Sequence, residues 1–263
     1  MGVTIHNLRL YHAFQEIERE APDLAAAHAR KQAALKKAKE GYRVAIAQTL
    51  GTLTRLWPLR DDPAPPWFGH AVAQLQDADA LFLAECDRLH QKFAEEGRPD
   101  RHPLVRAVKA RAVDLLAGCD ALLIAGGHVG ILRNRIAFFG IDSLLHTRPV
   151  IAWSGGAMVL ADRILLYHDH TNFGVGTAEM LDRGFGMAPG VVYLPHARQR
   201  LSLGNSPSVG ILARRLGPAR AIALENGAWI EDGRVRSTRE GLVSRLTDAG
   251  DVVNVGSDDA ARS

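Results

Sequence analysis

Ser154 stands in a sequence setting that suits a catalytic nucleophile. Residues 149–153 are mostly apolar and predict a strand, and the small residues Gly155, Gly156 and Ala157 follow the serine. A serine that projects from a tight strand-to-helix turn needs small neighbours, and the N–H groups that open the helix can bind an oxyanion. The segment therefore predicts either a nucleophile elbow or a strand-to-helix turn without catalysis.

A serine nucleophile needs a base, and the base needs an acid that orients it. His196 follows the predicted strand 191–194, and Glu225 ends the apolar run 221–224. Open α/β sheets place their sites at such strand ends. From the residues alone, each is either a site residue or an ordinary loop residue, and Asp169 is a second candidate for the acid.

Four segments, in this order along the chain, resemble one known family. The chain from about residue 119 to 236 resembles the serine peptidases that include aspartyl dipeptidase (peptidase E) and cyanophycinase, relatives of the class I glutamine amidotransferase-like fold. The matching segments are Asp-Ala-Leu-Leu-Ile-Ala-Gly-Gly-His at 120–128, Ala-Trp-Ser-Gly-Gly-Ala-Met at 152–158, the Gly-Phe-Gly-Met-Ala-Pro segment that runs into a histidine at 184–196, and Leu-Glu-Asn-Gly-Ala at 224–228.

This resemblance implies a role for each matching residue. Ser154 would be the nucleophile, His196 the general base and Glu225 the acid that orients it. The backbone N–H groups of Gly127 and Gly155 would form the oxyanion hole. The implied activity is hydrolysis of a small peptide or amide through an acyl-enzyme, without a cofactor or a metal. A serine in place of cysteine disfavours an amidotransferase with its own glutaminase site.

The resemblance also suggests residues that contact the substrate. His128 replaces the usual asparagine after Gly-Gly and would shape one wall of the pocket. Trp153 either packs under the turn or contacts the substrate. Arg198 and Arg200 follow His196 closely and could hold an acidic group of the substrate by charge-assisted hydrogen bonds. A solvated loop is the alternative for Arg198, whereas relatives such as cyanophycinase also carry arginine at the position of Arg200.

The elements that must position these residues change in kind near residue 118. Helical periodicity dominates before it, and short apolar runs typical of buried parallel strands follow it. We expect a three-layer α/β/α fold with a mainly parallel sheet: a helix-rich portion (1–118) packed on the core, an α/β core (119–254) and a frayed tail (255–263). One expected helix starts at Pro22, and the other expected helices span 72–97, 103–118, 131–145 and 206–215. The expected strands span 121–125, 149–153, 164–167, 191–194 and 221–224, and a hairpin turn is expected at 232–233.

Composition excludes several classes of function. The chain has 263 residues and a formal charge of only +3, so a nucleic-acid-binding surface is not expected. The basic stretch 30–39 follows acidic residues and lacks interleaved aromatics, which favours a solvated helix face. Two cysteines, the lack of a signal-peptide pattern and the lack of a long apolar run predict a cytoplasmic protein that does not enter membranes.

Two alternative interpretations stay open at this stage. His168 and His170 have a spacing that metal sites sometimes use, but no further ligands accompany them, which favours a polar loop. A non-catalytic binding or regulatory module that retains the amidotransferase-like fold is the rival function, with the helical portion as its partner surface. The oligomeric state, a homodimer included, is not fixed by the sequence.

Overall fold

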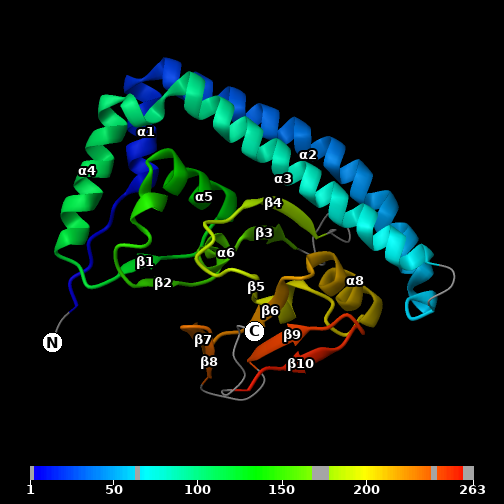
Figure 1. Ribbon diagram of the computed structural model, residues 1–263. Helices are drawn as coiled ribbons and strands as arrows, with labels where there is room; N and C mark the ends of the chain where they lie inside the picture. Colours follow the sequence, from blue (N-terminus) through cyan, green and yellow to red (C-terminus); the bar gives the residue numbers. More distant parts are fainter. Residues whose placement is uncertain (1–2, 63–65, 168–177, 238–241, 257–263) are drawn as a thin grey trace. The chain divides into compact units, whose positions relative to one another are not determined.

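The chain forms two compact units. The computed structural model (Figure 1) describes residues 3–62, 66–167, 178–237 and 242–256. The first unit comprises Met1–Ala38 and Glu85–Gly156, and the second comprises Lys39–Ala84 and Ala157–Ser263. Each unit therefore combines part of the helical N-terminal portion with part of the predicted α/β core.

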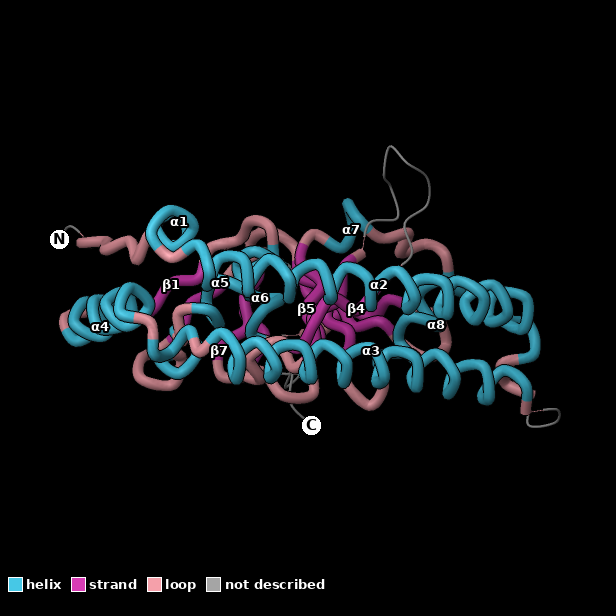
Figure 2. The backbone as a smooth tube through the Cα atoms, turned by 90° about the horizontal axis from the view of Figure 1, so that it is seen from above, coloured by secondary structure: helices cyan, strands magenta, loops and turns pink. Residues whose placement is uncertain are grey.

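Three of the N-terminal helices lie where the sequence predicts them, with α3 beginning five residues earlier than expected, whereas α1 was not predicted. These elements are α1 (Leu10–Glu20), α2 (Pro22–Leu56), η1 (Trp57–Leu59), α3 (Trp67–Gly97), η2 (Pro99–Arg101) and α4 (Pro103–Ala117). Pro22 and Pro103 open α2 and α4, because proline's fixed φ and missing N–H suit the first helical turn. α2 and α3 run side by side (Figure 2).

Two predicted strands of the first unit are confirmed, and one predicted helix is too long. β1 (Leu122–Ile124) pairs in parallel with β2 (Val150–Ala152). Between them lie α5 (Val129–Phe138) and the 3₁₀ turn η3 (Ile141–Leu144) in place of one continuous helix over 131–145. Gly140 has φ 63°, a conformation that ends a helix and that glycine adopts without steric cost.

The β1–β2 pair is buried on one face only, which corrects the expectation of a strand buried on both faces. Leu123 and Ile151 are register partners, and their side chains are 51% and 56% exposed. Leu122 and Ile124, which point to the opposite face because side chains alternate along a strand, are buried. An apolar run alone could not distinguish these two arrangements.

An aromatic cluster joins the helices of the first unit. The His28 ring of α2 lies 4.9 Å from Phe14 of α1, 5.7 Å from Phe93 of α3 and 5.3 Å from Phe138 of α5, measured between ring centroids. All of these contacts are edge-on, which aromatic rings prefer over a face-to-face sandwich. His28 is only 6% exposed, so it acts as a core residue.

Burial, together with the nearby charges of Lys31 and Arg135, lowers the pKa of His28 to about 3. In the unfolded chain this pKa returns to its ordinary value of 6.5. The unfolded state therefore binds more protons than the folded state between pH 6.5 and 3. As the pH is lowered through this window, the free energy of unfolding should fall by up to about 1.4 kcal/mol per pH unit. Urea titrations at several pH values should show this slope in the wild type and lose most of it in His28→Phe. The matched control His146→Gln, at an exposed histidine, should keep the slope.

The second unit holds the other described strands. They are β3 (Arg163–Leu166), β4 (Glu179–Arg183), β5 (Val191–Pro195), β6 (Arg220–Leu224), β7 (Ala228–Glu231), β8 (Arg234–Ser237), β9 (Val243–Leu246) and β10 (Val252–Asn254), with the helices α6 (Gly155–Leu160), which begins in the first unit, α7 (Ala197–Arg200) and α8 (Ser206–Leu216). β10, β9, β6 and β5 form one sheet in that order, in which β5 and β6 are parallel. The protein thus mixes helices with small sheets, some of them parallel.

Most of the sequence predictions for this unit are confirmed. The predicted strands at β3, β5 and β6 are present, and Asp232 and Gly233 both have positive φ in the turn between β7 and β8, as a two-residue hairpin requires. β4, β9 and β10 were not predicted. The cap of α8 is Asn205, whose side chain accepts from the N–H of Ser208 at 3.1 Å, and Ser206 and Pro207 form the first turn of the helix.

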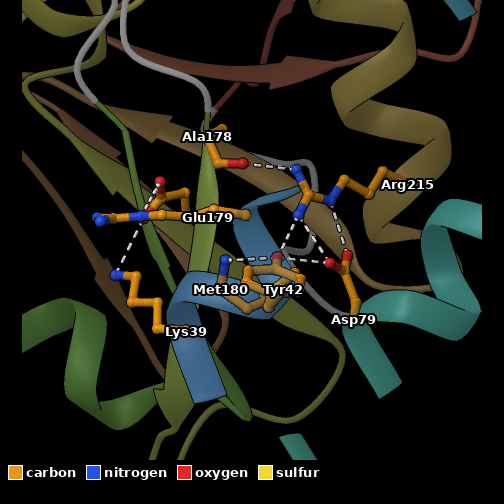
Figure 3. Close-up of polar contacts among 8 residues, drawn as sticks. Lys39, Tyr42, Asp79, Ala178, Glu179, Met180 and Arg215 are labelled. Atoms are coloured by element: carbon orange, nitrogen blue, oxygen red, sulfur yellow. Dashed lines mark hydrogen bonds and ion pairs between the residues drawn. The ribbon is translucent and has the colours of Figure 1, made fainter. Parts of the chain in front are cut away.

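A buried ion pair holds the helices of the second unit to its strands (Figure 3). Arg215 of α8 donates from Nε and Nη2 to both carboxylate oxygens of Asp79 in α3, at 2.7 Å each. Arg215 also donates to Tyr42 Oη of α2 at 2.6 Å and to the Ala178 carbonyl at 2.6 Å. The Tyr42 hydroxyl donates to Asp79 and accepts from the N–H of Met180 in β4. The guanidinium, the carboxylate and the phenol therefore form one network of mutual hydrogen bonds.

A second, more exposed group of charges lies beside this network (Figure 3). Glu179 of β4 accepts from Lys39 Nζ at 3.0 Å and from Arg43 Nε at 2.7 Å, both on α2. These contacts add a further link between α2 and β4. Because they are partly exposed, we expect them to stabilise the fold less than the buried pair does.

Replacing Asp79 by asparagine should destabilise the protein by about 3–5 kcal/mol, because Arg215 would keep its buried charge without a counter-ion. Urea denaturation of the full chain measures the loss. In the matched control Glu85→Gln, which removes an exposed pair with Arg88 on the same helix, the midpoint should not move. The double variant Asp79→Leu/Arg215→Met should recover much of the loss, and an additive double variant would contradict this explanation.

Candidate functional site

Ser154 lies on a tight turn between β2 and α6. Its φ is +53°, a left-handed conformation that residues other than glycine seldom adopt. The N–H of Gly156 donates to the Trp153 carbonyl at 2.9 Å across the turn, and α6 begins at Gly155. The serine side chain is half-buried. Ser154 therefore holds a rare left-handed conformation at the start of a helix, next to the N–H groups of the first helical turn.

The Gly126-Gly127 turn after β1 packs directly against Ser154. A Cβ on Gly126 would lie 2.6 Å from the Ser154 Cβ and 2.9 Å from its Oγ, so a larger residue would displace the serine. A Cβ on Gly155 would lie 3.0 Å from the Gly127 carbonyl oxygen and 3.6 Å from the Gly127 nitrogen. The structure therefore brings Gly127 and Gly155, the two predicted oxyanion-hole residues, together beside Ser154.

His128 and Trp153 flank this turn in different ways. The His128 Nδ1 atom accepts from the N–H of Ile131 at 3.3 Å and so caps α5, a role that the sequence did not reveal. Trp153 is 48% exposed.

His196 and Glu225 lie at the ends of two neighbouring parallel strands in the second unit. Pro195 and Leu224 are register partners in β5 and β6, and the N–H of His196 donates to the Leu224 carbonyl at 2.9 Å. His196 has φ 58° and is the N-cap of α7, so it occupies another left-handed position that is rare outside glycine. The structure thus places the predicted base next to the predicted acid in the sheet.

The Glu225 carboxylate is held by the start of α7. Its Oε1 atom accepts from the backbone N–H of Arg198 at 2.8 Å, in the first turn of the helix that His196 caps. Glu225 also lines a cavity of ≈ 360 Å³, together with Arg198, Ala223 and Ser244. One carboxylate oxygen is therefore fixed on the backbone beside His196. Ser154 belongs to the first unit, whereas His196 and Glu225 belong to the second.

The comparisons with known proteins give one structural match. No protein-family model matches this chain, and no curated protein does. A crystal structure of a peptidase from an acI-B1 Actinobacterium is similar at 16% sequence identity and a TM-score of 0.39, covering 68% of this chain and 75% of that one.

Tyr167 is a residue near the site that the sequence did not single out. Its hydroxyl donates to the Pro195 carbonyl at 2.7 Å, directly before His196. Burial raises the pKa of Tyr167, and the positive charge of Arg200 opposes that rise. In the sequence, the position of Tyr167 at the end of the predicted strand 164–167 was the signal that could have identified it as a residue near the site. Arg200 itself is half-buried in the last turn of α7, and Arg198 is exposed.

The remaining sequence predictions concern metals and membranes. His168, Asp169 and His170 lie outside the described residues, and the part of the chain that is described holds no cluster of three metal-ligating side chains. Within that part, no helix is both long enough and apolar enough to span a bilayer.

Proposed function

We propose that this protein is a serine hydrolase that cleaves a small peptide or amide through an acyl-enzyme. The observation that carries the proposal is Ser154 at φ +53° on a strand-to-helix turn packed on the Gly126-Gly127 turn. Such a strained serine costs stability, and strain of this kind is concentrated at functional sites. The order of the matching segments in the sequence resembles that of peptidase E and cyanophycinase, which adds support. The proposal also assigns β1, β2, β5 and β6 to one three-layer core.

In the proposed mechanism Ser154 Oγ attacks the carbonyl carbon of the substrate while His196 removes the hydroxyl proton. The developing oxyanion accepts hydrogen bonds from the N–H groups of Gly127 and Gly155. His196 then returns the proton to the leaving amine, and a water molecule, activated in the same way, releases the acyl group. Glu225 orients the imidazole and stabilises its protonated form.

The substrate contacts belong to the same proposal. Arg200 holds an acidic group of the substrate, since its planar guanidinium can bind a carboxylate through two hydrogen bonds. His128 and Trp153 form part of the surface around Ser154. His128 already uses Nδ1 to cap α5, which leaves Nε2 to face the substrate.

Covalent labelling tests this proposal without knowledge of the substrate. A fluorophosphonate probe should modify the native protein at Ser154, as located by peptide mass spectrometry, and should not modify heat-denatured protein. An activated serine alone reacts in this way, because an ordinary hydroxyl is a weak nucleophile. A protein that stays unlabelled at Ser154 would instead favour the non-catalytic binding module.

A further inference from the structure

A second cavity of ≈ 370 Å³ opens within the second unit, between α2, α8 and the segment 201–205. Apart from Arg215, the buried residues that line it are apolar, and Leu50 and Leu203, which also line it, are half-buried. The buried apolar lining residues are Leu201, Val209, Ile211, Leu212 and Leu246. A volume in this range, with an apolar interior and a polar rim, is typical of a small-molecule site.

The charged and neutral groups that line this cavity determine which ligand it can accept. Arg215 contributes to its lining, but Nε and Nη2 donate to Asp79 and Nη1 donates to the Ala178 carbonyl. A carboxylate in the cavity would have to compete with the buried Asp79 for the same guanidinium. The rim residues Thr54 and Ser208 are neutral. The cavity therefore suits a neutral, apolar group.

The short helix α7 connects the cavity to His196, the proposed catalytic base. Leu201, which lines it, donates its N–H to the Ala197 carbonyl at 2.8 Å, and Ala197 begins the helix that His196 caps. At about 1.5 Å per helical residue, Leu201 lies roughly 8 Å from His196 along α7. An extended peptide advances by about 3.5 Å per residue, so a residue within two positions of the scissile bond can reach this distance.

We propose that this cavity binds an apolar side chain of the substrate, of the size of leucine or phenylalanine, within two residues of the scissile bond. The proposal rests on the proposed peptidase function and adds a substrate class to it. Arg200 directly precedes Leu201, so a single short segment would present one charged and one apolar contact. The substrate would then combine an acidic group with an apolar neighbour.

A pair of matched threonines on α2 tests the cavity. Thr54 is exposed at its rim and donates to the Leu50 carbonyl, whereas Thr52, which does not line it, is exposed and donates to the Gln48 carbonyl. Thr54→Trp should fill the cavity. With dipeptides scanned over glycine, alanine, leucine and phenylalanine at one position, it should raise KM at least about tenfold for leucine and phenylalanine and leave KM for glycine unchanged. Thr52→Trp should leave the whole series unchanged.

Ligand-observed NMR on the full-length Ser154→Ala protein separates this inference from the proposed chemistry. N-acetyl-L-leucinamide should bind more tightly than N-acetylglycinamide, and adding Thr54→Trp should abolish the difference. Unchanged leucinamide binding, or unchanged KM for leucine substrates, would overturn the cavity assignment even if the protein hydrolyses peptides. Binding that depends on Thr54 in a protein that hydrolyses no peptide would support the apolar site and overturn the peptidase function instead.

Discussion

Ser154→Ala should reduce the rate of peptide or amide hydrolysis by about 10⁴-fold or more, because the acyl-enzyme cannot form without the hydroxyl. The fold should survive, since alanine and serine differ by one atom and bear the same strain at φ +53°. The measurement is the initial rate on any dipeptide or amide that the wild type cleaves, with urea denaturation to confirm equal stability.

Ser143→Ala is the matched control for this variant. Ser143 lies in the same unit, and its hydroxyl donates to the Gly140 carbonyl at 2.8 Å. The control should keep the wild-type rate. Retained hydrolysis in Ser154→Ala would remove Ser154 from the mechanism, whatever its labelling shows.

Glu225→Gln should reduce the rate by up to about 10⁴-fold, because a neutral amide neither fixes the imidazole tautomer nor stabilises the imidazolium. The amide oxygen of glutamine can still accept from the N–H of Arg198, so α7 should keep its attachment. Circular dichroism and the urea midpoint check this. The loss therefore measures the charge rather than the position of the helix.

Two comparisons make this result decisive. Asp169→Asn tests the alternative acid, and a large loss there with little change in Glu225→Gln would reverse the assignment. The double variant Ser154→Ala/Glu225→Gln should be no slower than Ser154→Ala alone, since residues that act as one triad lose their effects together. Multiplicative losses would show that the two residues act independently.

The turn at Ser154 could be predicted from the sequence because its signals are local. An apolar run, one serine and three small residues are contiguous, and the observed strand, turn and helix follow them in order. Gly140 is an equally local stop signal for α5, and the predicted helix over 131–145 continued past it.

Other features could not be predicted because they depend on distant partners. Asp79 and Arg215 are 136 residues apart, and each alone has the sequence context of a surface helix charge. β4 shows no alternation of apolar and polar residues, because its two buried positions hold Met180 and the charged Asp182. β10 has only three residues, too few for a pattern of period two to stand out.

The interleaving of the two units sets an order for events on the ribosome. All residues of the first unit have been synthesised once the chain reaches Gly156, whereas the second unit still lacks most of its residues at that point. Asp79 and Tyr42 are then already made, but Arg215 is not. Until α8 leaves the exit tunnel, this stretch of α2 and α3 carries an acid without its counter-ion, so these two helices gain their full stability only after α8 has emerged.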